Sequence, residues 1–69
     1  MAIRVHYAST IEGETLLSLS PDIPLSEAAN KARLIGCNIL VFNRFGWAIK
    51  KIETPVVKED GCSHAYIIK

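Results

Sequence analysis

The clearest structural signal in this chain is the segment Leu25-Ser-Glu-Ala-Ala-Asn-Lys-Ala-Arg-Leu-Ile-Gly36, which runs directly into Cys37-Asn-Ile-Leu-Val-Phe42. In its first half, apolar residues recur at helical spacing and most charged residues fall on the other side, as in an amphipathic helix of about ten residues. Ser26 is the expected N-cap, with Glu27 in the first turn, where the helix dipole favours an anion. Gly36 supplies the left-handed residue that follows many helices.

The apolar run after the glycine predicts a buried strand at the centre of a sheet. Residues 37–42 form a short run that is rich in branched and aromatic side chains. Residues 47–54 are expected to be the antiparallel neighbour of this strand. Asn43 and Gly46 suit the turn between the two, because glycine readily takes a positive φ and asparagine tolerates one. Pro55 marks the end of the pairing.

The two ends of the chain supply the remaining strands. Residues 3–7 and 15–19 both alternate between apolar and polar side chains on either side of a polar turn, so they are predicted to form a hairpin. Residues 63–69 follow an Asp60-Gly61 turn and predict the last strand. The expected order is β-β-α-β-β-β in a single compact domain, residues 1–69. This is an α+β two-layer sandwich, with one helix packed on an antiparallel sheet.

One helix can cover only one face of such a sheet. The opposite face, with Arg4, His6, Lys50 and Trp47, is therefore expected to meet solvent or a partner. The strand that ends in Ile67-Ile68 is expected to leave an unpaired edge, which makes a homodimer an option.

Composition limits the class of protein. The chain has 69 residues, of which 49% are hydrophobic and 22% charged, as in folded globular proteins. Its longest apolar run, residues 39–42, is far shorter than the roughly 20 residues of a membrane span. Because no signal-peptide pattern opens the sequence, a cytoplasmic protein is expected. Cys37 and Cys62 are predicted to be reduced thiols, since small secreted domains carry more disulfides.

No residue pattern predicts catalysis, a metal or a cofactor. Cys62 and His64 would share one strand face, but the chain lacks the C-x₂₋₄-C and H-x₃₋₅-H spacings of zinc sites. Whether these two side chains ever bind metal stays open. The glycine-rich motifs of nucleotide sites are also missing, and so small a domain has little room for a catalytic cleft. We therefore expect a protein that is not an enzyme, with no catalytic residue and no cofactor.

The candidate binding site is the segment Asn43-Arg-Phe-Gly-Trp-Ala-Ile-Lys-Lys51. Its turn chemistry needs no function, but a phenylalanine at a loop tip has little core to enter. Arginine and large aromatics are enriched in the hot spots of protein interfaces, and rings amid positive charge also suit single-stranded nucleic acid. We predict that a partner is bound by Arg44, Phe45, Trp47, Lys50 and Lys51.

The charge balance favours a protein as that partner. The sequence pI of about 7.8 lies below the value above about 9 that marks many nucleic-acid-binding domains. Small one-helix α+β proteins encoded by phages and mobile elements often act by occupying a surface of a larger host complex, an analogy of size and not of motif. We expect a protein-binding module, an inhibitor or accessory factor of a larger nucleic-acid-handling complex. Direct binding of single-stranded nucleic acid through the basic aromatic hairpin is the alternative.

Overall fold

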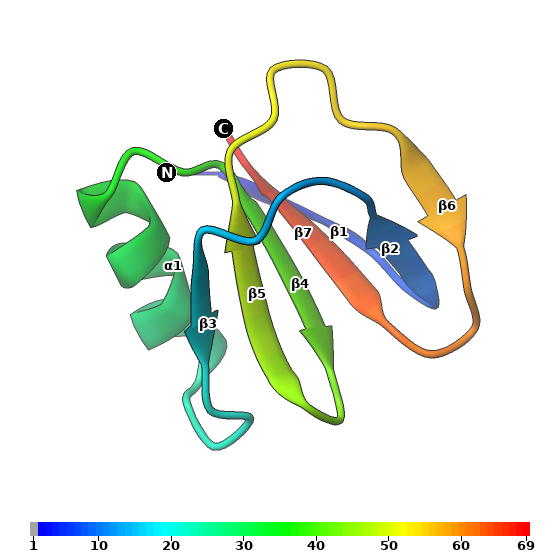
Figure 1. Cartoon of the computed structure of the whole chain (residues 1–69), viewed down its shortest axis with the longest axis horizontal. Helices are drawn as coiled ribbons and strands as arrows, with labels where there is room; N and C mark the ends of the chain where they lie inside the picture. The colour runs from blue at the N-terminus through cyan, green and yellow to red at the C-terminus, as the bar shows by residue number, and fades with distance from the viewer. Residues whose placement is uncertain (1) are drawn as a thin grey trace.

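The structure is an α+β fold in which one helix packs against an antiparallel sheet (Figure 1). It is a computed structural model that describes residues 2–69. Within these residues, five strands form the main sheet in the spatial order β1-β7-β4-β5-β3, and two more strands form a second sheet. The elements are β1 (Ile3–His6), β2 (Ser9–Ile11), β3 (Leu17–Leu19), α1 (Leu25–Leu34), β4 (Ile39–Asn43), β5 (Gly46–Lys50), β6 (Val57–Glu59) and β7 (His64–Ile68). The predicted helix-on-sheet α+β class is confirmed.

The apolar run after Gly36 forms the centre of the main sheet, as predicted. β4 lies between β7 and β5, and its residues Ile39, Leu40 and Val41 are buried. β5 pairs with β4 in the antiparallel sense, with Asn43 opposite Gly46 at the turn. β5 ends at Lys50, four residues before the end of the expected strand, residues 47–54.

Helix α1 covers one face of this sheet. Ala28, Ala29 and Ala32 are fully buried, because their short side chains let the helix backbone approach the strands. The prediction that Ser26 caps the helix is wrong: Pro24 occupies the N-cap position, and no side chain bonds there. Proline fixes φ, and its extended backbone ends directly before Leu25, so the helix begins before the serine is reached.

The predicted glycine stop at the end of α1 is confirmed. Gly36 has a φ of 76°. Its N–H donates to the Arg33 carbonyl at 3.1 Å, and the Cys37 N–H donates to the Ala32 carbonyl at 2.8 Å. These two bonds satisfy carbonyl groups that the last helical turn would leave without partners. They also direct the chain straight into the central strand.

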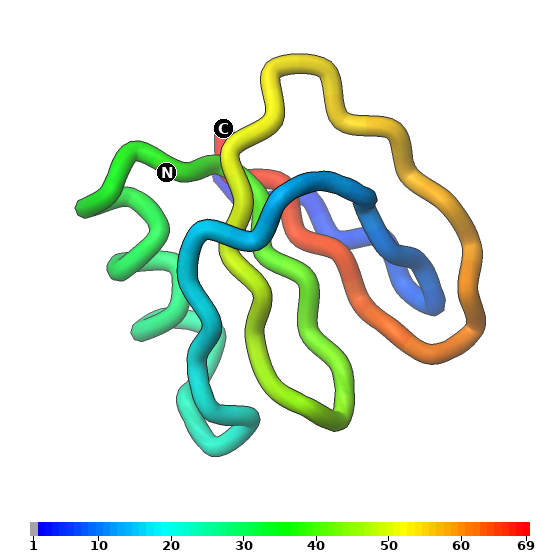
Figure 2. Tube along the Cα trace, in the orientation of Figure 1, coloured from blue at the N-terminus to red at the C-terminus, as the bar shows by residue number. Residues whose placement is uncertain are grey.

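The first strands of the chain do not pair with each other, so the predicted hairpin between residues 3–7 and 15–19 is wrong. β1 pairs with β7, and β3 pairs with β5. The chain instead turns at Tyr7 and Ala8, where Ala8 takes a φ of 54°, and enters β2. Figure 2 shows this blue turn beside the orange segment that leads into β7, and the Ala8 carbonyl accepts the N–H groups of Asp60 and Gly61.

The edges of the main sheet also differ from expectation. β7 lies between β1 and β4, so the strand that ends in Ile68 is not an edge. The outer strands are β1 and β3. The homodimer stays a prediction, but the strand that was expected to form its edge is an inner strand of the sheet.

The face opposite α1 is covered by the second sheet, in which β2 pairs with β6. Ile11 of β2 is fully buried against a cluster that contains Ile39, Val41 and Ala65. Lys50 points to the same side: it is 9% exposed, and its Nζ donates to the Ile11 carbonyl at 2.9 Å. The expectation that this face is free is therefore wrong at its centre.

Candidate functional site

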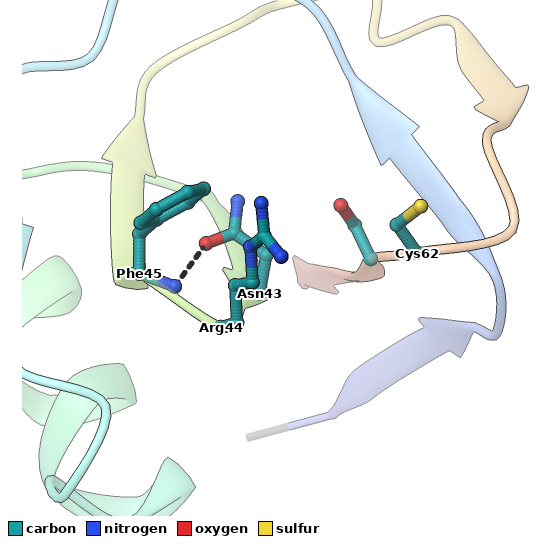
Figure 3. Close-up of a pocket in the computed structure, with 5 residues that line it drawn as sticks. Asn43, Arg44, Phe45 and Cys62 are labelled. Atoms are coloured by element: carbon teal, nitrogen blue, oxygen red, sulfur yellow. Dashed lines mark hydrogen bonds between the residues drawn. The ribbon is translucent and has the colours of Figure 1, made fainter.

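A cavity of about 340 Å³ lies between the β4–β5 turn and the β6–β7 turn (Figure 3). It is lined by Asn43, Arg44, Phe45, Cys62 and Ser63. We call it the tip pocket. Its two walls come from distant parts of the sequence, which meet because β4 pairs with β7 and sets Phe42 opposite His64.

The first wall is the turn formed by Arg44 and Phe45. The Phe45 N–H donates to Asn43 Oδ1 at 2.9 Å, which holds the turn from inside. Gly46 follows with a φ of 125°, a conformation that side-chain-bearing residues rarely adopt. A Cβ at Gly46 would overlap the Leu19 carbonyl oxygen. The hairpin tip is therefore packed tightly against the end of β3 while its two central side chains project outward.

Arg44 and Phe45 form an exposed cation–π pair. The guanidinium carbon lies 4.9 Å from the centre of the Phe45 ring, and Phe45 is 78% exposed. In the described part of the chain, one ion pair is formed, between Lys58 Nζ and Glu12 Oε2 at 3.2 Å. Arg44 therefore has no acidic partner among the residues that the structure describes. The ring limits the positions of the guanidinium without neutralising its charge.

The second wall is the turn that leads into β7. Asp60 Oδ1 accepts the N–H groups of Cys62 and Ser63, both at 2.9 Å. These two hydrogen bonds, of which the one from Cys62 has the larger effect, stabilise the ionised carboxylate. They hold the pKa of Asp60 below its ordinary value. The Ser9 N–H donates to the Ser63 carbonyl at 2.8 Å, which ties this wall to β2. Cys62 is exposed, whereas Ser63 is buried.

The residues predicted to bind a partner are divided by the structure. Arg44 and Phe45 lie together at the tip, and Lys51 is exposed at the other end of β5. At about 3.4 Å per residue, that end is roughly 20 Å from Phe45. Trp47 and Lys50 are buried.

Trp47 belongs to the core beneath α1, so the expectation that it lies on a free face is wrong. It is 5% exposed, its Nε1–H donates to the Ile23 carbonyl at 2.7 Å, and its ring packs against those of Phe42 and Tyr66. The sequence contained a signal for this position, because Trp47 precedes the apolar Ile49 by two residues and shares its strand face.

Cys62 and Ser63 are the pocket residues that the sequence analysis did not connect with the hairpin. The sequence suggests Cys62 as a reduced thiol and as a metal ligand together with His64, and gives no sign that it lies near Arg44. His64 Nδ1 instead accepts the Ala8 N–H at 3.3 Å, and its ring meets the Tyr7 ring edge to face at 5.5 Å. Within residues 2–69 no three His, Cys, Asp or Glu side chains form a group that could hold a metal ion.

Comparison with known proteins found no matching family model, no matching curated protein and no matching solved structure. No helix in the part of the chain that the structure describes has the length and apolar character needed to cross a bilayer.

Proposed function

We propose that this chain is a non-enzymatic, cytoplasmic protein-binding module, an inhibitor or accessory factor of a larger complex, which acts through its tip pocket. The observation that carries the proposal is the exposed pair of Arg44 and Phe45 on a tightly held turn beside a cavity. Arginine and aromatic side chains dominate the binding energy of protein interfaces when they enter a desolvated pocket or flank one.

The energetics of Phe45 favour this role. Burying a phenylalanine side chain that was in water contributes about 1.5–3 kcal/mol. The turn is already ordered by the Asn43 bond and by the packing of Gly46, so little conformational entropy is lost when a partner binds. The exposed ring is thus a binding anchor that the fold itself does not use.

A protein partner is favoured over single-stranded nucleic acid because two of the residues expected to read nucleic acid are inside the molecule. Single strands are bound by successive aromatic platforms along a positively charged groove. With Trp47 and Lys50 buried, the tip offers one exposed ring and one guanidinium. This is enough for an anchor in a protein interface and short of a track for a polynucleotide.

Affinity capture from native cell extract tests the proposal. Wild-type protein and the Arg44→Ala/Phe45→Ala variant are used as baits, each with and without nuclease. We expect a protein that resists nuclease treatment, binds the wild type and is absent from the variant. Capture that disappears with nuclease would support nucleic-acid binding instead, and identical capture by both baits would contradict a role for the tip.

A further inference from the structure

We propose that the tip pocket binds a carboxylate group, presented by an aspartate or glutamate side chain of the protein partner. This inference rests on the function proposed above and names the chemistry by which the partner is recognised. Its basis is the set of polar groups that line the cavity.

Hydrogen-bond donors dominate this lining. Arg44 brings the five N–H groups of its guanidinium, whereas the Ser63 hydroxyl on the other wall is engaged with the Asp60 carboxylate. Asn43 Oδ1 already accepts the Phe45 N–H at 2.9 Å, so the other end of that amide is the donor Nδ2. None of the lining residues that the structure describes is acidic. A cavity rich in donors and free of carboxylates suits an anionic acceptor.

The donors are gathered on one wall. In Figure 3, Asn43 and Arg44 lie on the hairpin side of the cavity, and the Arg44 guanidinium points toward Cys62. A guanidinium presents its N–H groups as a planar fork, which matches the two oxygens of a carboxylate. The amide of Asn43 adds a further donor to the lining of the pocket.

Phe45 makes the arginine a better anion receptor. The guanidinium carbon lies over its ring, 4.9 Å from the ring centre. An apolar neighbour keeps water away from the side of the charge that it covers, which strengthens charge interactions there. The same ring offers apolar contact to the methylene groups of an acidic side chain.

The charges around the pocket favour a carboxylate over a phosphate. Arg44 is the cation among the lining residues, and Lys50 is buried under β2. Asp60 stands directly behind Cys62 and Ser63, and its hydrogen bonds keep it ionised. One cation beside a fixed negative charge accommodates a single negative charge more easily than the larger charge of a phosphate monoester.

A titration followed by two-dimensional NMR of backbone amides tests the proposal. The probes are acetyl-glutamate-amide, its neutral match acetyl-glutamine-amide, and inorganic phosphate, each added at low ionic strength. We expect weak, saturable shifts from the glutamate probe, confined to residues 43–46 and 61–63. The glutamine probe is expected to leave these signals unmoved, and phosphate to bind more weakly than glutamate.

Three variants connect the signal to the guanidinium. Arg44→Ala is expected to weaken glutamate binding about tenfold or more, since a hydrogen bond to a charged group contributes about that factor. Arg44→Lys keeps the charge but loses the fork, so an intermediate affinity is expected. Arg33→Ala removes an exposed arginine from α1 and is expected to leave binding unchanged. The amide spectra also report whether each variant is folded.

The outcomes separate this proposal from the proposed function. The carboxylate site would be overturned by equal binding of both amide probes, or by shifts outside the two turns. It would also be overturned if Arg33→Ala weakened binding as much as Arg44→Ala, even if the tip captured a protein partner. Tighter binding of phosphate would overturn it in favour of a nucleic-acid backbone. Localised glutamate binding without any captured partner would support the carboxylate site and contradict the proposed function.

Discussion

Gly46 is the residue that connects the hairpin tip to the rest of the fold. It has a φ of 125°, and a Cβ at this position would overlap the Leu19 carbonyl oxygen and lie 3.2 Å from the Pro21 nitrogen. Backbone atoms cannot give way as a flexible side chain does. Any side chain here must push the hairpin away from the end of β3.

Gly46→Ala is accordingly expected to lower the free energy of unfolding by about 3 kcal/mol or more, the sum of an unfavourable φ and a steric overlap. Gly36→Ala is the matched control, since Gly36 also has a positive φ but a Cβ there meets no atom within 4 Å. That control is expected to lose only about 1–2 kcal/mol. Urea denaturation measures both values, and equal losses would contradict the packing argument.

Asp60 gives the second wall of the pocket a dependence on pH. Its carboxylate accepts two N–H groups, so its pKa is lower in the folded state than in the unfolded chain. Stability from such a group is complete above the unfolded pKa and is lost as the pH falls through the folded pKa. Below a pH of roughly 4, the unfolded chain therefore takes up the proton more readily than the folded protein.

Asp60→Asn keeps an oxygen acceptor for both N–H groups but binds no proton. As the pH is lowered from about 6 to about 3, the wild type is expected to lose more stability than this variant. Denaturation curves at several pH values measure the difference. If the two proteins lost stability in parallel, Asp60 would not be the linked group.

Residue identity predicted some side-chain positions and not others. Phe45 and Arg44 are exposed because a two-residue turn directs both away from the sheet, and the turn was visible in Asn43 and Gly46. Lys50 gave no comparable signal, because a lysine on a strand is normally solvated. Its burial depends on β2, a strand that the sequence analysis did not predict.

At the scale of elements, β2 has the largest effect on the site. The turn at Tyr7 and Ala8 sends it across the face opposite α1, where it pairs with β6 and shields Lys50. The same turn holds the Asp60 segment through the Ala8 carbonyl. β2 thus removes a cation from the surface and steadies one wall of the tip pocket.

Lys50→Ala is expected to lower the free energy of unfolding by about 2 kcal/mol or more, because it empties buried volume and removes the donor to the Ile11 carbonyl. Lys51→Ala changes the adjacent, exposed lysine and is expected to stay within about 0.5 kcal/mol of the wild type. Chemical denaturation of the two variants measures the contrast. Equal, small effects would mean that β2 does not bury Lys50.

Periodicity predicted most of the elements and few of their partners. Alternating side chains reveal that residues 3–7 form a strand with two different faces, but the same pattern fits any neighbour. Local sequence therefore predicted the β4–β5 hairpin, whose strands are joined by a short turn. It could not predict that β1 pairs with β7, because this pairing joins residues from opposite ends of the chain.

At the scale of the whole molecule, the tip pocket lies apart from the two apolar clusters that form the core. One apolar cluster lies beneath α1 and the other beneath β2 and β6, on opposite faces of the main sheet. Neither includes Arg44 or Phe45. The tip pocket stands at the end of the sheet, where its side chains can be exchanged without emptying either cluster.

The most direct test combines thermal unfolding and nuclease-treated capture for wild type and Arg44→Ala/Phe45→Ala. We expect nearly equal melting temperatures, together with a captured protein that is lost from the variant. A large fall in melting temperature would show that the tip belongs to the core. Equal melting temperatures with unchanged capture would show that the tip pocket binds no protein, and would contradict the proposed function.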